Sequence, residues 1–385
     1  MTWSSGSPEV RARWGLDPSV RFLNNGSFGA TPTVVLDAVR AIHLEMEAEP
    51  VRFFARELPD RLAVARAAVA GFLGADPAGL AFVPNATAGV NAVLRSFPWQ
   101  RGDGLLLSDQ TYNAVKQTAL WVAERYCVEL QWARLPFPLE SAGEMLTPWL
   151  AAARPNTRLA VVDHVSSPTA MILPVREIVA GLQANGIPVL VDGAHAPGML
   201  PLDLTNVGAA FYVGNLHKWA YAAKGSAILQ VSPDWRARIQ PVSISHGYRQ
   251  GLVAEFDWTG TMDVAPWLTA PLALDFWRSL PGIAASNHAL VQTGRQLVAV
   301  ALGTDLPHPD DPALYGPMAA MLWPEPFSGD FRQTLDLSAR LYEAHRIEVP
   351  FLNYDQRVWL RISGQAFNHP DDYEALAEVL RGGWR

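Results

Sequence analysis

The sequence predicts an α/β fold, with a mixed and mostly parallel sheet in a large domain and a smaller α+β domain after it. Short apolar runs alternate with helical patterns from residue 80 to residue 231, which is typical of a sheet with right-handed crossover connections. Near residue 268 the pattern changes to consecutive helices and then strands. The 385 residues suffice for both domains. We therefore expect a lead-in over residues 1–20, a large domain over 21–265 and a small domain over 266–385.

Residues 1–20 are expected to form a loosely ordered lead-in. A turn-forming segment, LNNGSFGATP, follows from Leu23. Pro32 is predicted to be the first residue of a helix that runs to about Glu47, with Thr31 as its cap. A second helix, amphipathic and rich in Ala and Arg, is predicted over 57–73.

The first α/β unit begins with an apolar strand over 80–83. The next residues end the strand, and a helix is predicted from Ala86 to about Phe97. Because this helix opens with the small residues Ala86 and Thr87, its backbone N–H groups can approach an anion, whose charge the helix dipole favours. The alternative is a helix that Asn85 caps and that binds nothing.

The remaining strands are predicted from apolar runs, and the remaining helices from helical patterns of apolar residues. Apolar runs predict strands over 104–107, 128–132, 159–163, 187–191, 209–213 and 226–231. Helical patterns precede Cys127 and end near residue 153, and another covers 174–185. In the small domain we expect helices over 271–280, 283–302 and 333–345, and strands near 347–352 and 357–363.

Two of the predicted strands end in polar residues. One apolar run is followed directly by Asp192. The run over 209–213 is followed by Asn215, His217 and Lys218. Because ligands bind beyond the carboxyl ends of parallel strands, we expect the carboxylate and the amine at the same edge of the sheet. Pyridoxal phosphate needs such a pair: the lysine forms a Schiff base with it, and the carboxylate keeps the pyridine nitrogen protonated.

Lysine is rare in this chain. Among 30 basic residues there are three lysines, Lys116, Lys218 and Lys224. Arginine cannot form an imine, so a lysine retained behind a histidine at a strand end is a candidate nucleophile. The alternatives are a solvated surface lysine at 218 and a helix cap or structural ion pair at Asp192.

Four motifs carry a family resemblance. VDGAHAPG at 191–198, followed by GNLHKW at 214–219, resembles the pyridoxal-phosphate enzymes of aminotransferase class V. The branch that contains isopenicillin N epimerase-like proteins is the most similar, and LNNGSFGATP and DWTGTMD at 257–263 fit the same branch. The resemblance covers roughly residues 20 to 365. It implies the type I fold of pyridoxal-phosphate enzymes, this cofactor, and a homodimer with a shared active site.

The resemblance also implies the catalytic residues. Lys218 would hold the cofactor and then move the α-proton of the substrate. Asp192 would keep the ring nitrogen charged, and His195 would lie near the ring and tune its phenolate oxygen. The resemblance also implies residues that contact the phosphate or the ring of the cofactor. They are Ala86, Thr87, Ser167, Asn215, His217 and, from the second chain, Thr261.

Three further residues complete the implied site. Tyr112, just past a strand end, would stack on the pyridine ring; the alternative is a tyrosine packed on the core. Asn25 lies in the segment that would cover the active site and bind substrate. Arg361, on one face of the last predicted strand, would anchor the substrate carboxylate through its planar fork. The alternative for Arg361 is a solvated arginine.

Composition and spacing disfavour several other classes. The net charge of −7 and the lack of a basic stripe argue against a nucleic-acid partner. No apolar run reaches membrane-spanning length and no signal peptide is evident, so we expect a cytoplasmic protein without a membrane partner. A single cysteine, Cys127, rules out an internal disulfide. His164, His195 and Asp192 lack a zinc signature, so no metal site is expected.

The expected activity is α-proton abstraction from an amino acid or an amino-acid-derived substrate. Reprotonation from the other face gives epimerisation, reprotonation at the cofactor carbon gives transamination, and β-elimination gives a carbon–sulfur lyase. The motifs are shared by all three reactions, so they select neither the reaction nor the natural substrate. Cys127, late in a helix with apolar neighbours, is expected to be structural, which disfavours a classical desulfurase.

Two alternatives lie outside this chemistry. A dehydrogenase would need G-x-G-x-x-G after the first strand, where Pro84-Asn85-Ala86-Thr87 stands instead. A catalytically silent relative that serves as a binding protein is disfavoured by Asp192, His217 and Lys218.

Overall fold

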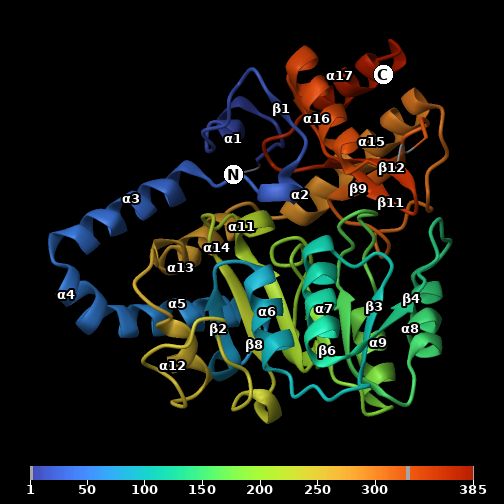
Figure 1. The fold of residues 1–385 in the computed structure, drawn as a ribbon. Coiled ribbons are helices and arrows are strands. Elements are labelled where there is room, and N and C mark those ends of the chain that lie inside the picture. The colour runs from blue at the N-terminus through green and yellow to red at the C-terminus, as the bar shows by residue number, and fades with distance from the viewer. Residues whose placement is uncertain (1–2, 327–329, 385) are drawn as a thin grey trace.

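A seven-stranded sheet forms the centre of the large domain in the computed structural model, which describes residues 3–326 and 330–384 (Figure 1). Its strand order is β2-β8-β7-β6-β5-β3-β4. Strand β8 is antiparallel to both of its neighbours, and the pairs from β7 to β4 are parallel. The strands are β2 (Leu80–Val83), β3 (Gly104–Ser108), β4 (Glu129–Ala133), β5 (Thr157–Asp163), β6 (Val189–Asp192), β7 (Phe211–Asn215) and β8 (Ala227–Val231). The predicted mixed, mostly parallel sheet is confirmed.

Helices cover both faces of this sheet. On one face, α6 (Ala86–Ser96) and α7 (Asn113–Tyr126) pack on alternate strand residues such as Val161, Leu190 and Val213. The intervening residues belong to the other core, with α5 (Leu58–Leu73) and α9 (Val175–Gln183). Because side chains alternate along a strand, the last residues of β5, β6 and β7 face the α6 and α7 side.

The small domain is a three-stranded antiparallel sheet with helices around it. Its strand order is β11-β12-β9. The elements are β9 (Met318–Leu322), β11 (Phe351–Tyr354), β12 (Arg357–Ser363), α15 (Ile283–Leu302), α16 (Phe331–His345) and α17 (Pro370–Arg381). The expected α+β arrangement is confirmed. Strand β1 (Arg21–Phe22) pairs with β10 (Ile347–Glu348), so the chain just after the lead-in joins a strand of the small domain.

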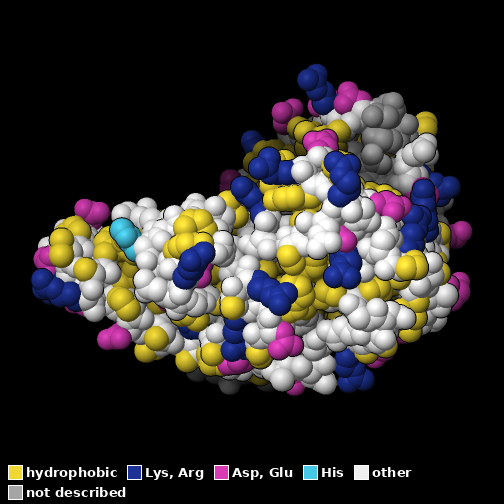
Figure 2. All heavy atoms as spheres, turned by 60° about the horizontal axis from the view of Figure 1, so that its bottom comes forward, with side chains coloured by type: hydrophobic (Ala, Val, Ile, Leu, Met, Phe, Trp, Pro, Cys, Tyr) yellow, Lys and Arg dark blue, Asp and Glu magenta, His cyan; other side chains and the backbone are white. Residues whose placement is uncertain are grey.

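An arm that contains α3 (Thr33–Ala48) and α4 (Pro50–Arg52) projects at the left of Figure 1. Helix α5 follows this arm and returns to the core on the sheet. Other short helices connect the two domains or flank the strand ends: α2 (Asn25–Phe28), α8 (Leu146–Ala152), α10 (Leu204–Val207), α11 (Leu216–Trp219), α12 (Leu252–Asp257), α13 (Ala265–Leu268) and α14 (Ala270–Arg278). Figure 2 shows charged side chains of both signs interspersed over the face that it displays. No helix of the described chain is long and apolar enough to cross a bilayer.

Most predicted elements have the expected type, but the lead-in was wrong. A short helix, α1 (Pro8–Arg11), precedes Trp14, which is 4% exposed. The indole lies edge-on against the rings of Tyr221, Phe276 and Phe367, so the described part of the lead-in is packed on the core. A single buried aromatic in a polar segment leaves no periodic signal.

Smaller corrections concern helix starts and missed elements. Helix α3 begins at Thr33 with Pro32 before it, and the Thr31 hydroxyl donates to the carbonyl of Ala222 instead of capping. Strand β9 and helices α12 and α17 were not predicted. The β9 sequence, MAAML, lacks the β-branched and aromatic residues that mark a strand.

Candidate active site

Three strand ends bring polar side chains to one edge of the sheet. Asp163, Asp192 and Asn215 are the last residues of β5, β6 and β7. Helix α11 follows β7 at once, because the N–H groups of its first two residues donate to the carbonyl of Ser226. This short helix sets Lys218 at the same edge, as the sequence analysis expected for neighbouring parallel strands.

The half-buried Lys218 places its amine beside His195. Its Nζ lies 3.3 Å from Nε2 of the imidazole. Burial and, to a smaller extent, the positive charge of Arg361 lower the pKa of Lys218 to about 7, while the carboxyl of Asp192 opposes the shift. A large fraction of the amine is therefore neutral and nucleophilic at physiological pH.

His195 is held as a neutral ring. Burial lowers its pKa well below the usual value, and the charges of Lys218 and Arg361 add to the effect. The indole Nε1 of Trp219 donates to Nδ1 across 3.4 Å. The hydrogen of the neutral ring is therefore on Nε2, which faces the lone pair of the Lys218 amine.

Asp192 is 5% exposed and forms no ion pair within the described chain. The backbone N–H of Ala194 donates to its Oδ1 at 3.0 Å. Burial raises the pKa of Asp192, while the Ala194 hydrogen bond and the charge of Lys218 act against the shift. A buried carboxyl with one hydrogen bond is suited to receive a cationic ring nitrogen.

The N-terminus of α6 lies at the same edge of the sheet. The backbone N–H of Ala86 donates to Oδ1 of Asn215 at 2.8 Å, and the Asn85 side chain caps the N–H of Ala88. Gly89 permits the close approach of the helix to β7, since a Cβ there would lie 2.7 Å from Cγ1 of Val213. Ala86 and the adjacent Thr87 are thus at a helix N-terminus that can attract an anion.

His217 can contact such an anion only in one protonation state. Its Nδ1 donates to the carbonyl of Ser226 at 2.8 Å. Burial lowers the pKa of His217 to about 4, and the charge of Lys218 adds to the shift. The neutral ring then carries no hydrogen on Nε2, so donation to a phosphate from that atom requires a protonated ring, which a phosphate dianion favours.

Arg361 reaches this edge from β12 of the small domain. It is 3% exposed, so the alternative of a solvated arginine is excluded. Its Nη1 donates to the carbonyl of Ser167 at 2.7 Å, and its Nη2 donates to the hydroxyl of Ser27 at 3.2 Å. It makes no ion pair with any described carboxylate. Burial lowers the pKa of Arg361 to about 10. A buried guanidinium without an anion fits a substrate carboxylate.

Asn25 fixes the segment that lies against α11 (Figure 1). Its amide Nδ2 donates to the carbonyl of Lys218 at 3.3 Å, and its Oδ1 accepts from the N–H of Ala30. Gly29 has a φ of 57°, and a Cβ there would lie 2.4 Å from the carbonyl oxygen of His217. The Asn25 amide thus positions the lysine backbone, and its contact with substrate stays a prediction.

The other predicted residues lie around this group. Tyr112 precedes α7 and is 46% exposed, so its ring is open to a ligand instead of packed in the core. Ser167 lies in the loop after β5 and binds Arg361 through its carbonyl and its hydroxyl. Thr261 is exposed in the segment between α12 and α13. The roles of these three residues toward a cofactor remain predictions.

Asp163 was missed as a site residue, although it ends a predicted strand just as Asp192 does. It is 3% exposed and pairs with Asp192 in the β5–β6 register. His164, the next residue, does not join the group, because its Nδ1 bonds the hydroxyl of Tyr212 at 2.8 Å. The strand-end position was the signal that could have identified Asp163.

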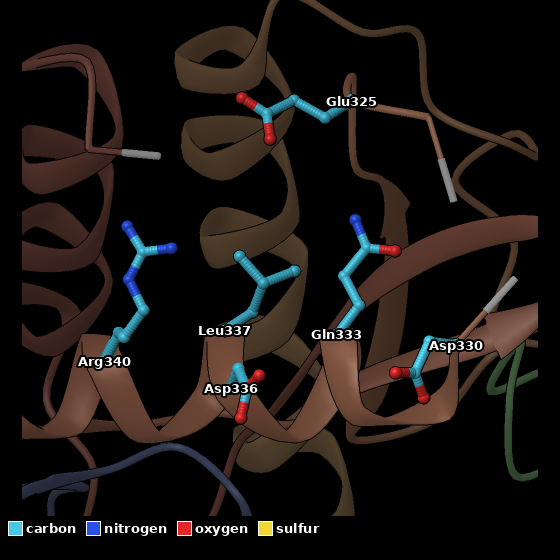
Figure 3. A pocket seen from close by; sticks show the side chains of 6 residues that line it. All are labelled: Glu325, Asp330, Gln333, Asp336, Leu337 and Arg340. Carbon is cyan, nitrogen blue, oxygen red and sulfur yellow. The ribbon is translucent and has the colours of Figure 1, made fainter. Parts of the chain in front are cut away.

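A separate pocket lies on the small domain (Figure 3). It has a volume of about 310 Å³ and is lined by α16 and the segment before it. Its lining residues are Glu325, Asp330, Gln333, Asp336, Leu337 and Arg340. None of the residues gathered around Lys218 contributes to this pocket, so it is not the candidate site.

The family follows from comparison with known proteins. Residues 21–303 match the model of the family described as aminotransferase class-V. The chain belongs to this family. It is therefore an enzyme, its cofactor is pyridoxal phosphate, and the alternative of a silent binding protein falls away.

The individual relatives of this chain are named for more than one activity. The chain is 35% identical to isopenicillin N epimerase of Streptomyces clavuligerus over 97% of each protein. It is 33% identical to the same-named enzyme of Amycolatopsis lactamdurans, over 98% of each. It is also 28% identical to an L-cysteine desulfhydrase of Arabidopsis thaliana, over 93% of this chain and 86% of that protein.

Solved structures share the fold. A cysteine desulfurase from Thermococcus onnurineus superposes with a TM-score of 0.81 at 18% identity, over 99% of each chain. The cystine C–S lyase C-DES, in complex with cysteine persulfide, superposes with a TM-score of 0.79 at 20% identity, over 94% of this chain and 98% of that chain. The type I fold of pyridoxal-phosphate enzymes is confirmed.

The side chains at the sheet edge fit pyridoxal phosphate. Its aldehyde requires a nucleophilic amine, its ring nitrogen a carboxylate and its phosphate a set of N–H donors. Lys218 is a half-buried amine with a pKa of about 7, and Asp192 is a buried carboxyl without an ion-pair partner among the described residues. The N-terminus of α6 would hold the phosphate, together with Asn215.

Proposed function

We propose that this enzyme removes the α-proton of an amino acid or amino-acid-derived substrate and that Cα receives a solvent-derived proton from the opposite face, as in an epimerase. One observation carries the proposal: a nucleophilic lysine and a buried arginine without an anion lie at the same site. The pKa of Lys218 is lowered partly by the charge of Arg361, so the two groups are electrostatically coupled. The identity to two isopenicillin N epimerases over nearly the full length supports the same reaction.

The residues of the chain have distinct tasks in this reaction. Pyridoxal phosphate, when bound, supplies an electron sink for the negative charge that develops at Cα. Arg361 binds the substrate carboxylate and orients the α-carbon. Lys218 would accept the α-proton of the substrate. Asp192 would keep the proton on the ring nitrogen of the cofactor. The neutral His195, 3.3 Å from the Lys218 amine, would orient that amine without adding a charge.

Exchange of the α-hydrogen in heavy water tests the proposal directly. The enzyme is incubated with a panel of amino acids and short amino-acid-derived carboxylates, and deuterium at Cα is measured together with chiral analysis. We expect deuterium uptake with formation of the opposite enantiomer, and loss of both in Lys218→Ala. A panel in which no substrate exchanges its α-hydrogen, with cofactor fully bound, contradicts the proposal.

A carbon–sulfur β-lyase is the second candidate. The similarity to L-cysteine desulfhydrase favours it, and so does the position of the single cysteine. The carbonyl of Cys127 accepts from the N–H of Gly102, which precedes β3, so Cys127 lies at the amino edge of the sheet, opposite Lys218. Cys127 is exposed at the end of α7, which corrects the expectation of a structural residue with apolar neighbours. A lyase that releases sulfide needs no such thiol. Formation of keto acid, ammonia and sulfide from cysteine, without racemisation, would establish this reaction.

We further propose that the active unit is a cytoplasmic homodimer. A groove of about 920 Å³ lies between α5 and α12 and is lined by apolar residues such as Leu58, Leu62 and Leu252. It includes Trp258, three residues before Thr261, the residue expected to contact the phosphate of the second chain. Light scattering should give a dimer, and a fully active monomer at assay concentration would end this proposal. The single cysteine supports the cytoplasm.

A further inference from the structure

Asp163 is a second buried carboxyl beside Asp192. The two residues end the parallel strands β5 and β6 and are direct partners in the register of the sheet. Both lie on the sheet face that α6 and α7 cover, since Val161 and Leu190 pack there two residues earlier. Two carboxyl groups are thus delivered next to each other where the ring nitrogen of the cofactor would be held.

Burial prevents both groups from being ionised together. In a low-dielectric site two neighbouring carboxyls share a proton, because each negative charge disfavours the other. Burial raises the pKa of Asp163 well above its usual value and the charge of Asp192 adds to the shift, while hydrogen bonds from the N–H of Tyr112 and the hydroxyl of Thr111 act against it. The remaining charge that faces Asp163 is that of Lys116 on α7.

The surroundings decide which carboxyl keeps the proton. The Oδ2 atom of Asp163 has no hydrogen-bond partner among the described residues, whereas Asp192 accepts from Ala194 and is favoured as an anion by Lys218. Lys116 forms no ion pair with Asp163 among the described residues, and its Nζ donates to the carbonyl of Asp109 at 2.6 Å. The proton therefore belongs on Asp163 and the charge on Asp192.

We propose that Asp163 is a positioning residue that remains a neutral carboxylic acid, and thereby leaves Asp192 as the single carboxylate at the ring nitrogen of the cofactor. The role of Asp192 rests on the proposed function, but the charge of Asp163 does not. An ionised Asp163 would push Asp192 toward its protonated form and remove the charge that the ring nitrogen requires. A neutral Asp163 also spares the site an uncompensated second negative charge.

Infrared spectroscopy of the apoenzyme tests the charge of Asp163 without substrate or cofactor. Protein labelled with carbon-13 at the aspartate carboxyl groups is compared with unlabelled protein, for the wild type, Asp163→Asn and Asp192→Asn. We expect a protonated-carboxyl band in the wild type at neutral pH that Asp163→Asn removes and Asp192→Asn keeps. A wild type without the band overturns the proposal, and so does a band that only Asp192→Asn removes.

The cofactor spectrum supplies a second readout. The absorbance of the bound cofactor is titrated with pH in the wild type and in Asp163→Asn, and the midpoint is compared. If Asp163 is neutral, an asparagine keeps the same charge and the midpoint moves by less than about 0.3 pH unit. If Asp163 is ionised, its loss removes a negative charge and lowers the midpoint by about one unit or more, which contradicts the proposal.

Folding and function are kept apart in this design. Thermal melting reports whether Asp163→Asn folds, and Asp163→Ser is the substitute if it does not, because serine is also neutral. The loss of the infrared band in whichever of these two variants folds decides the proposal. A failed substrate panel would overturn the proposed reaction and leave the infrared result untouched.

Discussion

Two buried clusters of charged side chains look alike in this enzyme and differ in one respect. At the sheet edge, His195 and Arg361 are buried, Lys218 is half-buried, and the pKa values of all three are lowered. In the small domain, Arg295 and His308 are buried with lowered pKa values as well. Burial and a perturbed pKa therefore do not by themselves distinguish an active site from a structural cluster.

The difference lies in the partners. Arg295 donates to Nδ1 and to the carbonyl of His308, and its guanidinium lies 4.4 Å from the centre of the Tyr315 ring. Asp310 of the same cluster accepts from Tyr315 and Gln292. The hydrogen bonds of Arg361 go to serine hydroxyl and carbonyl oxygens, and it forms no ion pair among the described residues. An uncompensated buried charge costs several kcal/mol, so it indicates a missing ligand.

Loss of Lys218 should have the largest effect. Lys218→Ala removes the amine that we propose binds the cofactor and accepts the α-proton, so turnover should fall by at least about 10³-fold. Borohydride reduction and peptide mapping of the wild type should place the pyridoxyl group on Lys218. Label on Lys116 or Lys224 would refute the assignment.

Arg361 and Arg295 should respond in opposite ways to the same substitution. Arg361→Lys keeps the charge but loses the planar fork, so KM for carboxylate substrates should rise by roughly 10- to 100-fold with little change in Tm. Arg295→Lys should lower Tm and leave KM near its wild-type value, because this arginine binds only protein atoms in the described chain. Equal effects on KM would show that the two clusters do not differ as we infer.

Attachment of the cofactor should depend on pH with a midpoint set by Lys218. The neutral amine is the nucleophile, and its pKa of about 7 means that the neutral form grows as pH rises through that value. The rate at which apoenzyme binds pyridoxal phosphate, followed by absorbance, should therefore level off just above neutrality. A rate that continues to rise toward the ordinary lysine pKa of 10.5 would exclude a buried, perturbed amine.

His308 should make stability depend on pH. Burial, with a further contribution from the charge of Arg295, lowers the pKa of His308 from 6.5 to about 4. Between these two values the unfolded chain binds more protons, so stability falls as pH drops from about 6.5 to about 4, by up to roughly 3 kcal/mol for this residue.

The variant His308→Gln isolates this contribution. Its Tm should decline less steeply than that of the wild type over the same acidic range, because glutamine does not titrate. Buried carboxyls such as Asp163, with raised pKa values, act in the opposite direction in both proteins and cancel in the comparison. Parallel slopes would show that His308 is not held neutral.

Cys127 should matter least. It lies at the amino edge of the sheet, so Cys127→Ser should keep cofactor binding, α-hydrogen exchange and any sulfide release within about twofold. Selective loss of sulfur release, with cofactor bound normally, would restore a persulfide mechanism.

The strands of the large sheet could be predicted from the sequence because their apolar runs are local. The predicted strand over 80–83 matches β2, and the runs that end near Asp163 and Asp192 match β5 and β6. Strand ends in a parallel sheet share an edge, so Asp192 and Lys218 could be placed together without coordinates. The rarity of lysine in the chain gave a chemical reason to choose Lys218 as the nucleophile, and that reason depends on residue type alone.

Tertiary structure decided everything that depends on residues far apart in the chain. Arg361 meets Ser167 across 194 residues and Ser27 across 334, because the small domain packs over the sheet edge. The amide of Asn25 donates to the backbone carbonyl of Lys218, 193 residues away, and no local pattern in the sequence reveals this hydrogen bond. The pairing of Asp163 with Asp192 depends on which strands become neighbours. The lowered pKa of Lys218 likewise arises from burial and from charges on other elements, which exist only in the folded chain.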